Sequence, residues 1–112
     1  MVNTNVGTSP FTIGKGESHA IATITGNYTA TEDNYTMLVN NSGTATITLP
    51  AAAGCAGRVY IIKKISGASN DVVIDGNASE TIDGVTTKTL TTQYDSVMFQ
   101  SNGTAWFILS KN

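Results

Sequence analysis

The chain has 112 residues and a formal net charge of −2 at pH 7, and only 12% of its residues are charged. This length suits one compact domain. The richness in Thr (18), Asn (10) and Gly (11) disfavours a helical bundle, a coiled coil or a charged disordered chain. Six Lys and Arg residues are too few for a phosphate-tracking stripe, and no apolar stretch is long enough to span a membrane. We therefore expect neither nucleic acid nor a membrane as a partner.

The first 18 residues are expected to form an extended N-terminal arm. They hold few large apolar residues, chiefly Val6, Phe11 and Ile13, and Pro10 and several glycines interrupt any periodicity. Such an arm needs a surface to lie on, so it is predicted to lie on a neighbouring protomer. The sequence thus predicts an arm over residues 1–18 and a single β-sandwich domain over residues 19–112.

From residue 19 onward, short runs rich in β-branched residues alternate with turn residues. The predicted strands cover residues 19–25, 35–39, 44–49, 58–65, 71–75, 80–82, 86–90, 94–100 and 104–109. Asp83-Gly84 and residues 101–103 are typical of tight hairpin turns, whereas residues 51–54 allow at most one helical turn after Pro50. This spacing predicts an all-β fold, namely an antiparallel β-sandwich or jelly-roll-like domain.

Several predicted strands carry apolar residues on both faces. In residues 58–65, Val59 and Ile61 alternate with Tyr60 and Ile62. The predicted core comprises Val59, Ile61, Ile65, Val97, Phe99, Trp106 and Ile108. Because one sandwich buries only one face of each sheet, the other apolar face needs a partner, and self-association is expected to supply it.

The sequence contains no recognisable catalytic constellation. His19 is the only histidine, and its neighbours Glu17 and Ser18 are not at a spacing that indicates a catalytic triad, which assembles in space. Cys55 is the only cysteine and is expected to be a buried or interface thiol. One His and one Cys cannot build a structural zinc site within one chain. We expect no enzyme activity, no metal and no cofactor.

Four carboxylates, Asp71, Asp75, Glu80 and Asp83, fall close together in the sequence. A small hydrolase would need two of them to line a cleft as an acid and base pair, and a calcium site would need closer, loop-forming spacing. The preferred interpretation is that these acids cap turns around the nearby glycines.

Two sets of polar or aromatic residues have more than one interpretation. Lys63 and Lys64 lie in the most apolar predicted strand, so one of them must face the core or an interface, unless it is a lysine that snorkels at an edge. A buried ammonium is expected to have a carboxylate partner. The tyrosines and Trp106 could stack on sugars, although core and interface packing is the preferred interpretation.

An ordered series of short segments resembles a β-domain that recurs in virion proteins of tailed bacteriophages. The matching segments are residues 34–39, 46–50, 57–65, 73–74, 80–84, 94–97 and 101–106. They include Ile-Thr-Leu-Pro, Ile-Lys-Lys, Glu-Thr-Ile-Asp-Gly and Asn-Gly-x-x-Trp, in that order, and the similarity covers residues 28–109. Proteins of this family lie at the ends of tail fibres and on head fibres or head decorations.

The resemblance implies a virion surface protein, usually a homotrimer, without enzyme activity. Because the chain shows no shaft repeat, we expect a capsid decoration protein on the phage head, made in the host bacterial cytoplasm and anchored by its arm to the major capsid protein. No secretory signal is visible in the sequence. The alternative is the receptor-binding tip of a tail fibre, which would recognise host-surface glycan through Tyr28, Tyr35 and Tyr94.

Overall fold

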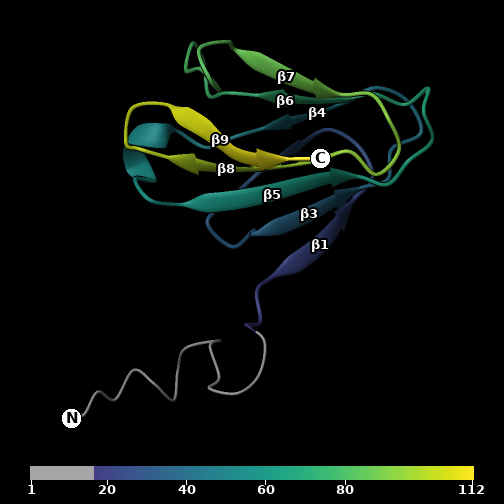
Figure 1. Ribbon diagram of the computed structural model, residues 1–112, viewed down its shortest axis with the longest axis horizontal. Coiled ribbons are helices and arrows are strands. Elements are labelled where there is room, and N and C mark those ends of the chain that lie inside the picture. Colours follow the sequence, from purple (N-terminus) through teal and green to yellow (C-terminus); the bar gives the residue numbers. More distant parts are fainter. Residues whose placement is uncertain (1–16) are drawn as a thin grey trace.

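The computed structural model describes residues 17–112, which form two β-sheets packed face to face (Figure 1). The five-stranded sheet has the order β1-β3-β5-β8-β9, and the four-stranded sheet has the order β2-β4-β6-β7. The strands are β1 (Ile21–Ile24), β2 (Tyr28–Thr29), β3 (Thr36–Val39), β4 (Ala45–Thr48), β5 (Val59–Lys64), β6 (Val72–Asp75), β7 (Thr87–Leu90), β8 (Ser96–Ser101) and β9 (Trp106–Lys111). A 3-10 turn, η2 (Ala52–Gly54), links β4 to β5.

The first six strands alternate between the two sheets. The odd-numbered strands β1, β3 and β5 pair with one another in parallel, and so do the even-numbered strands β2, β4 and β6. Parallel neighbours need a crossover connection, and here each crossover is a strand of the opposite sheet. The chain therefore winds around the core before β7, β8 and β9 add antiparallel pairs at one side of each sheet.

The prediction of a β-sandwich is confirmed, but the prediction that it is antiparallel or jelly-roll-like is wrong, because both sheets are mixed. Turn residues such as those between β3 and β4 reverse the chain, and the same residue types also occur in hairpins within one sheet. The five residues between Val39 and Ala45 instead carry the chain from one sheet to the other. A bend over the end of the sandwich uses the same Asn, Ser and Gly residues as a hairpin turn.

The two predicted hairpin turns are present. Asp83 and Gly84 have φ values of 50° and 85°, and the backbones of Ile82 and Val85 exchange hydrogen bonds across them. Positive φ at both central residues is typical of the tightest hairpin turn. The strand that follows, however, pairs with β6 rather than with the residues before the turn. The second turn joins β8 to β9 and places Gly103 at a φ of 94°.

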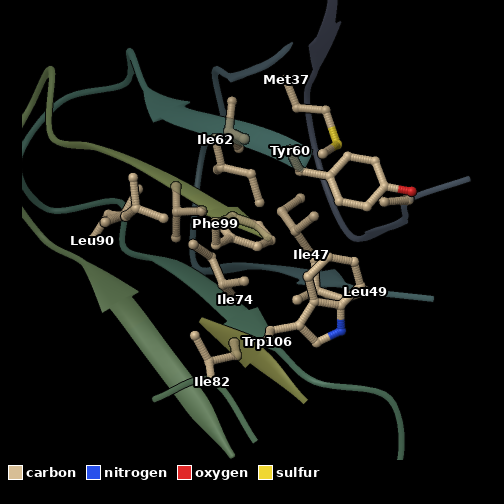
Figure 2. Packing of buried hydrophobic residues seen from close by; sticks show 14 of the residues in the cluster. Met37, Ile47, Leu49, Tyr60, Ile62, Ile74, Ile82, Leu90, Phe99 and Trp106 are labelled. Carbon is tan, nitrogen blue, oxygen red and sulfur yellow. The ribbon is translucent and has the colours of Figure 1, made fainter. Parts of the chain in front are cut away.

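A single apolar cluster fills the space between the sheets (Figure 2). Three aromatic rings meet in it, with the Trp106 centroid 5.6 Å from that of Tyr60 and 5.7 Å from that of Phe99. The Tyr60 hydroxyl donates a 2.7 Å hydrogen bond to the carbonyl oxygen of Thr31, and burial raises the pKa of this phenol above its usual value. Fully burying one large apolar side chain stabilises the fold by about 1.5–3 kcal/mol, which makes this cluster the main source of stability.

The alternation within β5 is as predicted, but the choice of core face is wrong. Tyr60 and Ile62 are fully buried, whereas Val59 and Ile61 are only half-buried. Among the other predicted core residues, Val97, Phe99 and Trp106 are buried, Ile65 is half-buried, and Ile108 packs against the cluster. Both faces of β5 are apolar, so its periodicity does not identify the inner face.

Candidate functional site

The outer faces of the two sheets have opposite chemistry. On the four-stranded sheet, the outward positions are mainly threonines: Thr29, Thr46, Thr48, Thr87 and Thr89, together with Val73 and Asp75. The register places Thr29, Thr48, Asp75 and Thr87 in one row across the four strands. Hydroxyl groups and a carboxylate are well hydrated, so this face is suited to solvent.

About half of the outward positions of the five-stranded sheet are apolar, and the others are polar, among them Thr23, Thr36, Lys63, Ser96 and Gln100. We call the set Ile21, Leu38, Val59, Ile61, Met98 and Phe107 the outer apolar face. Ile61 lies at its centre, in register with Thr36 on β3 and with Met98 on β8. Ile21 and Phe107, on the two edge strands of the sheet, are 65% and 42% exposed. Leu109, beside a bulge in β9, adds a further apolar side chain that is 53% exposed.

Lys63 supplies the only charge among the outward strand positions of this sheet within residues 17–112. Its ammonium group is directed to one margin, where Nζ lies 3.3 Å from the Tyr94 carbonyl oxygen and 5.7 Å from the centre of the Tyr94 ring. A cation above a tyrosine face is attracted by the ring quadrupole. The centre of the outer apolar face is therefore uncharged.

The structure does not bring the three candidate glycan-contact tyrosines together. Tyr35 precedes β3 at the end of the five-stranded sheet where β5 begins, and Tyr94 lies beside the last residue of β5. Tyr28 is half-buried against the core, and its hydroxyl donates a 3.1 Å hydrogen bond to Asn34 Oδ1. Only Tyr94, at 56% exposed and with a φ of 74°, projects as an exposed aromatic ring from a loop.

A shallow hollow of about 300 Å³ lies elsewhere, between residues 25–27 and 41–45. It is lined by Thr, Asn, Ser, Gly and Ala residues and contains none of the tyrosines. This hollow is therefore not an aromatic-lined groove of the kind that holds a sugar ring by stacking.

His19 and Cys55 each pack against neighbouring side chains. The His19 ring stacks on Tyr35 with centroids 4.1 Å apart, and its Nε2 lies 3.1 Å from Glu17 Oε1. Cys55 is half-buried and packs against the core, as expected for a small apolar side chain. Within residues 17–112, no group of three or more His, Cys, Asp or Glu side chains is arranged to hold a metal ion.

Two of the four candidate carboxylates bind backbone amides. Glu80 Oε1 accepts a 2.8 Å hydrogen bond from the Ala52 amide, and Asp83 Oδ1 accepts one of 3.0 Å from the Ile108 amide. Asp75, by contrast, lies in the threonine row of the four-stranded sheet. Glu80 and Asp83 therefore tie their loop to distant parts of the chain, which differs from the local turn capping around nearby glycines that the sequence analysis preferred.

Lys64 is the buried lysine of the pair. It is fully buried, and its Nζ donates to the carbonyl oxygens of Ser66 and Gly67 and, at 3.0 Å, to Ser66 Oγ. These acceptors replace the carboxylate that we expected. Ser66 Oγ donates in turn to Asn41 Oδ1 at 2.6 Å, and Asn41 Nδ2 donates to the Asp71 carbonyl oxygen at 2.9 Å. This network joins the loops at one end of the sandwich.

The segments that carry the family resemblance meet in one part of the structure. The Glu80 hydrogen bond to Ala52 links the Glu-Thr-Ile-Asp-Gly segment to the turn that follows Ile-Thr-Leu-Pro. Ile82 forms a bridge with Trp106, and the Trp106 amide donates to the Thr81 carbonyl oxygen at 2.9 Å. Trp106 closes the Asn-Gly-x-x-Trp segment. Residues 80–84, Ala52 and Trp106 thus form one packed corner of the sandwich.

The candidate arm residues Val6, Phe11 and Ile13 lie outside the described residues. The main surface that the sequence analysis did not assign is the outer apolar face, including Leu38, Met98 and Phe107. Its signal was already present as strands that are apolar on both faces, but only the sheet register identifies which side chains share the outer face.

Comparisons with known proteins do not assign the chain to a family. Neither the protein-family models nor the curated protein sequences gave a match. Within residues 17–112, no helix has the length and apolar character required to cross a membrane.

Proposed function

We propose that this chain is a structural protein of a bacteriophage virion, a homotrimer that decorates the head surface and is anchored to the major capsid protein by its N-terminal arm. The sandwich acts as a small knob outside the capsid. No chemical reaction forms part of this role.

The observation that carries the proposal is the packed corner formed by the resembling segments. Residues 80–84 and 101–106 are separated in the sequence, yet hydrogen bonds and a β-bridge join them at Ile82 and Trp106, and Glu80 accepts a hydrogen bond from Ala52, two residues after the segment 46–50. A resemblance carried by residues that pack together supports a shared domain architecture better than scattered matches would. The surface role follows from that family, and the outer apolar face supports assembly into an oligomer.

The proposal is tested by immunogold labelling of intact phage particles with an antibody against this chain. Gold distributed over the head is the expected result. Gold confined to the tail end would replace head decoration with a tail-fibre role, and particles without gold would overturn both virion roles. Particles treated with pre-immune serum provide the control.

The alternative function is a receptor-binding tip that recognises host-surface glycan. The exposed ring of Tyr94, with the Lys63 ammonium group beside it, favours this alternative, because sugar rings stack on exposed aromatic faces. Thermal melting in the presence of host polysaccharide tests it. A stabilisation that disappears in the Tyr94→Ala variant would support glycan binding, and an unchanged melting temperature with every host glycan would contradict it.

A further inference from the structure

We infer that Tyr94 and Lys63 form a binding site for an acidic saccharide, that is, a sugar that carries a carboxylate group. The Tyr94 ring is the surface on which the sugar stacks, and the Lys63 ammonium group is the partner of the carboxylate. The inference goes beyond head decoration. It names the ligand class for the glycan-binding alternative, and it rests on that alternative.

The first observation is the backbone conformation of Tyr94. Its φ of 74° lies in the left-handed region, which glycine and asparagine adopt readily and a bulky aromatic residue rarely does. Within residues 17–112, the other non-glycine residues with positive φ are Ala78 and Asp83, and neither is aromatic. Strained residues persist only where the surrounding structure holds them, and they are concentrated at functional sites such as ligand clamps.

Hydrogen bonds hold the loop of residues 91–95 around this strained residue. The Tyr94 amide donates to the Lys64 carbonyl oxygen at 2.7 Å. The Thr92 amide donates to Asp95 Oδ2 at 3.1 Å, and the Asp95 amide donates to the Thr92 carbonyl oxygen at 3.0 Å. The Tyr94 ring is therefore presented in a fixed position before a ligand arrives, which lowers the entropy cost of binding.

The Tyr94 ring points to solvent and is 56% exposed. An exposed ring gains little from packing, so its own burial does not compensate for the strained backbone. A ligand that stacks on the ring supplies a reason to keep it in this conformation. Thr91, Thr92 and Gln93 are also exposed and offer hydroxyl and amide groups for hydrogen bonds with the hydroxyl groups of a sugar.

The second observation is the charge of Lys63. Its Nζ lies 5.7 Å from the centre of the Tyr94 ring and 3.3 Å from the Tyr94 carbonyl oxygen, so the ammonium group is held beside the ring. Within residues 17–112, the one ion pair closer than 4.0 Å joins His19 to Glu17, so Lys63 has no carboxylate partner there. Its charge is therefore available to a ligand.

The ring and the ammonium group together distinguish an acidic sugar from a neutral one. A neutral sugar would use the ring and the polar groups of the loop but would leave the ammonium group without a counter-charge. A carboxylate on the sugar forms a charge-assisted hydrogen bond with Lys63, which is stronger than a bond between neutral groups. The hollow between residues 25–27 and 41–45 offers neither an aromatic ring nor a charged side chain.

The test measures binding of the full chain to polygalacturonate and to its methyl ester by isothermal titration calorimetry. The two polymers share one backbone and differ in their carboxylate groups. We expect polygalacturonate to bind about tenfold more tightly, because one charge-assisted contact is gained. Lys63→Met should remove this preference, and Tyr94→Gly should abolish binding of both polymers. Lys88→Met, on β7 of the other sheet, removes the same charge elsewhere and should bind as the wild-type chain does.

Thermal melting tests the strain separately from binding. Glycine adopts a positive φ without strain, so Tyr94→Gly should melt at or above the temperature of the wild-type chain. Thr92→Gly, in the same loop but at a residue without positive φ, should melt at a lower temperature. If Tyr94→Gly melts below Thr92→Gly or does not fold, the ring serves the fold and the inference is overturned.

The outcomes separate the inference from the functions proposed above. Equal binding of the two polymers by the wild-type chain would retain glycan binding and overturn the acidic ligand class. Binding of neither polymer would overturn the site, whereas melting with host polysaccharide decides glycan binding in general. Equal losses for Lys88→Met and Lys63→Met would show attraction by net charge alone and would also overturn the site. Immunogold labelling decides head decoration independently of these results.

Discussion

At the scale of single residues, Lys64 is the side chain on which one end of the sandwich depends most. Its ammonium group is fully buried and donates hydrogen bonds to oxygen atoms of Ser66 and Gly67. The Ser66 hydroxyl in turn donates a hydrogen bond to Asn41. Removing a buried donor leaves its acceptors unpaired, which costs more free energy than the intact bond contributes. The network is therefore expected to be sensitive to loss of the ammonium group.

Lys64→Ala is expected to lower the free energy of unfolding by about 3–5 kcal/mol, through unpaired carbonyl oxygens and an unfilled cavity. Lys63→Ala, the adjacent control on the outer face, should cost less than about 1 kcal/mol. Urea denaturation of both variants measures the difference. Equal losses for the two lysines would show that burial of the ammonium group does not determine stability here.

The sequence predicted that one lysine of this pair is buried but not which one. Alternation separates Lys63 from Lys64, yet residues of both faces of β5 are apolar, so the pattern fits either assignment. For the same reason Val59 and Ile61 were predicted as core residues in place of Tyr60 and Ile62. The acceptors of Lys64 are mostly backbone carbonyl oxygens, which residue types alone do not reveal.

At the scale of elements, two glycines between β6 and β7 constrain the chain in different ways. Gly84 has a φ of 85° in an exposed turn, and a methyl group there would have no atom within 4 Å. Gly76 has ordinary backbone angles, but a methyl group there would collide with the carbonyl group of Glu80. Glu80 also accepts a hydrogen bond from the Ala52 amide, so moving the backbone near Gly76 would disturb this contact in the packed corner.

Gly76→Ala is therefore expected to lower the free energy of unfolding by about 2–3 kcal/mol, because backbone must move to relieve the collision. Gly84→Ala should cost only about 1 kcal/mol, from the left-handed conformation alone. Thermal unfolding of the two variants ranks them. A larger loss for Gly84→Ala would mean that the hairpin turn, rather than the packed corner, limits stability.

Strand positions were easier to predict from the sequence than strand partners. The predicted runs at 35–39, 58–65 and 94–100 correspond to β3, β5 and β8, whereas β2, only two residues long, has too little pattern to detect. Pairing depends on which sheet a strand joins after each turn. A turn that crosses between sheets and a turn that closes a hairpin use the same residue types, so the parallel pairs were missed.

At the scale of the whole molecule, the two outer faces of the sandwich differ in their side chains. The outer face of the four-stranded sheet is rich in threonine, whereas about half of the outward positions of the five-stranded sheet are apolar, so the two sides differ in how well they are hydrated. β1, the edge strand that carries Ile21, is also the first strand of the described chain.

Deleting residues 2–16 tests whether the arm binds the particle while the sandwich folds and self-associates without it. Every strand within residues 17–112 lies beyond residue 20, so the shortened chain should fold and self-associate as the full chain does. Binding to phage particles should be lost, because burial of Val6, Phe11 and Ile13 would contribute about 1.5–3 kcal/mol each before ordering costs. Three arms in one homotrimer would multiply that contribution through effective concentration.

Co-sedimentation with particles that lack this protein measures the binding, and light scattering measures the assembly. A full-length variant with Phe11→Asp and Ile13→Asp is the matched control, since it keeps the length of the arm but not its apolar anchors. Both changes should abolish co-sedimentation. Unchanged affinity of the shortened chain would contradict anchoring by the arm and would move the capsid contact to the sandwich.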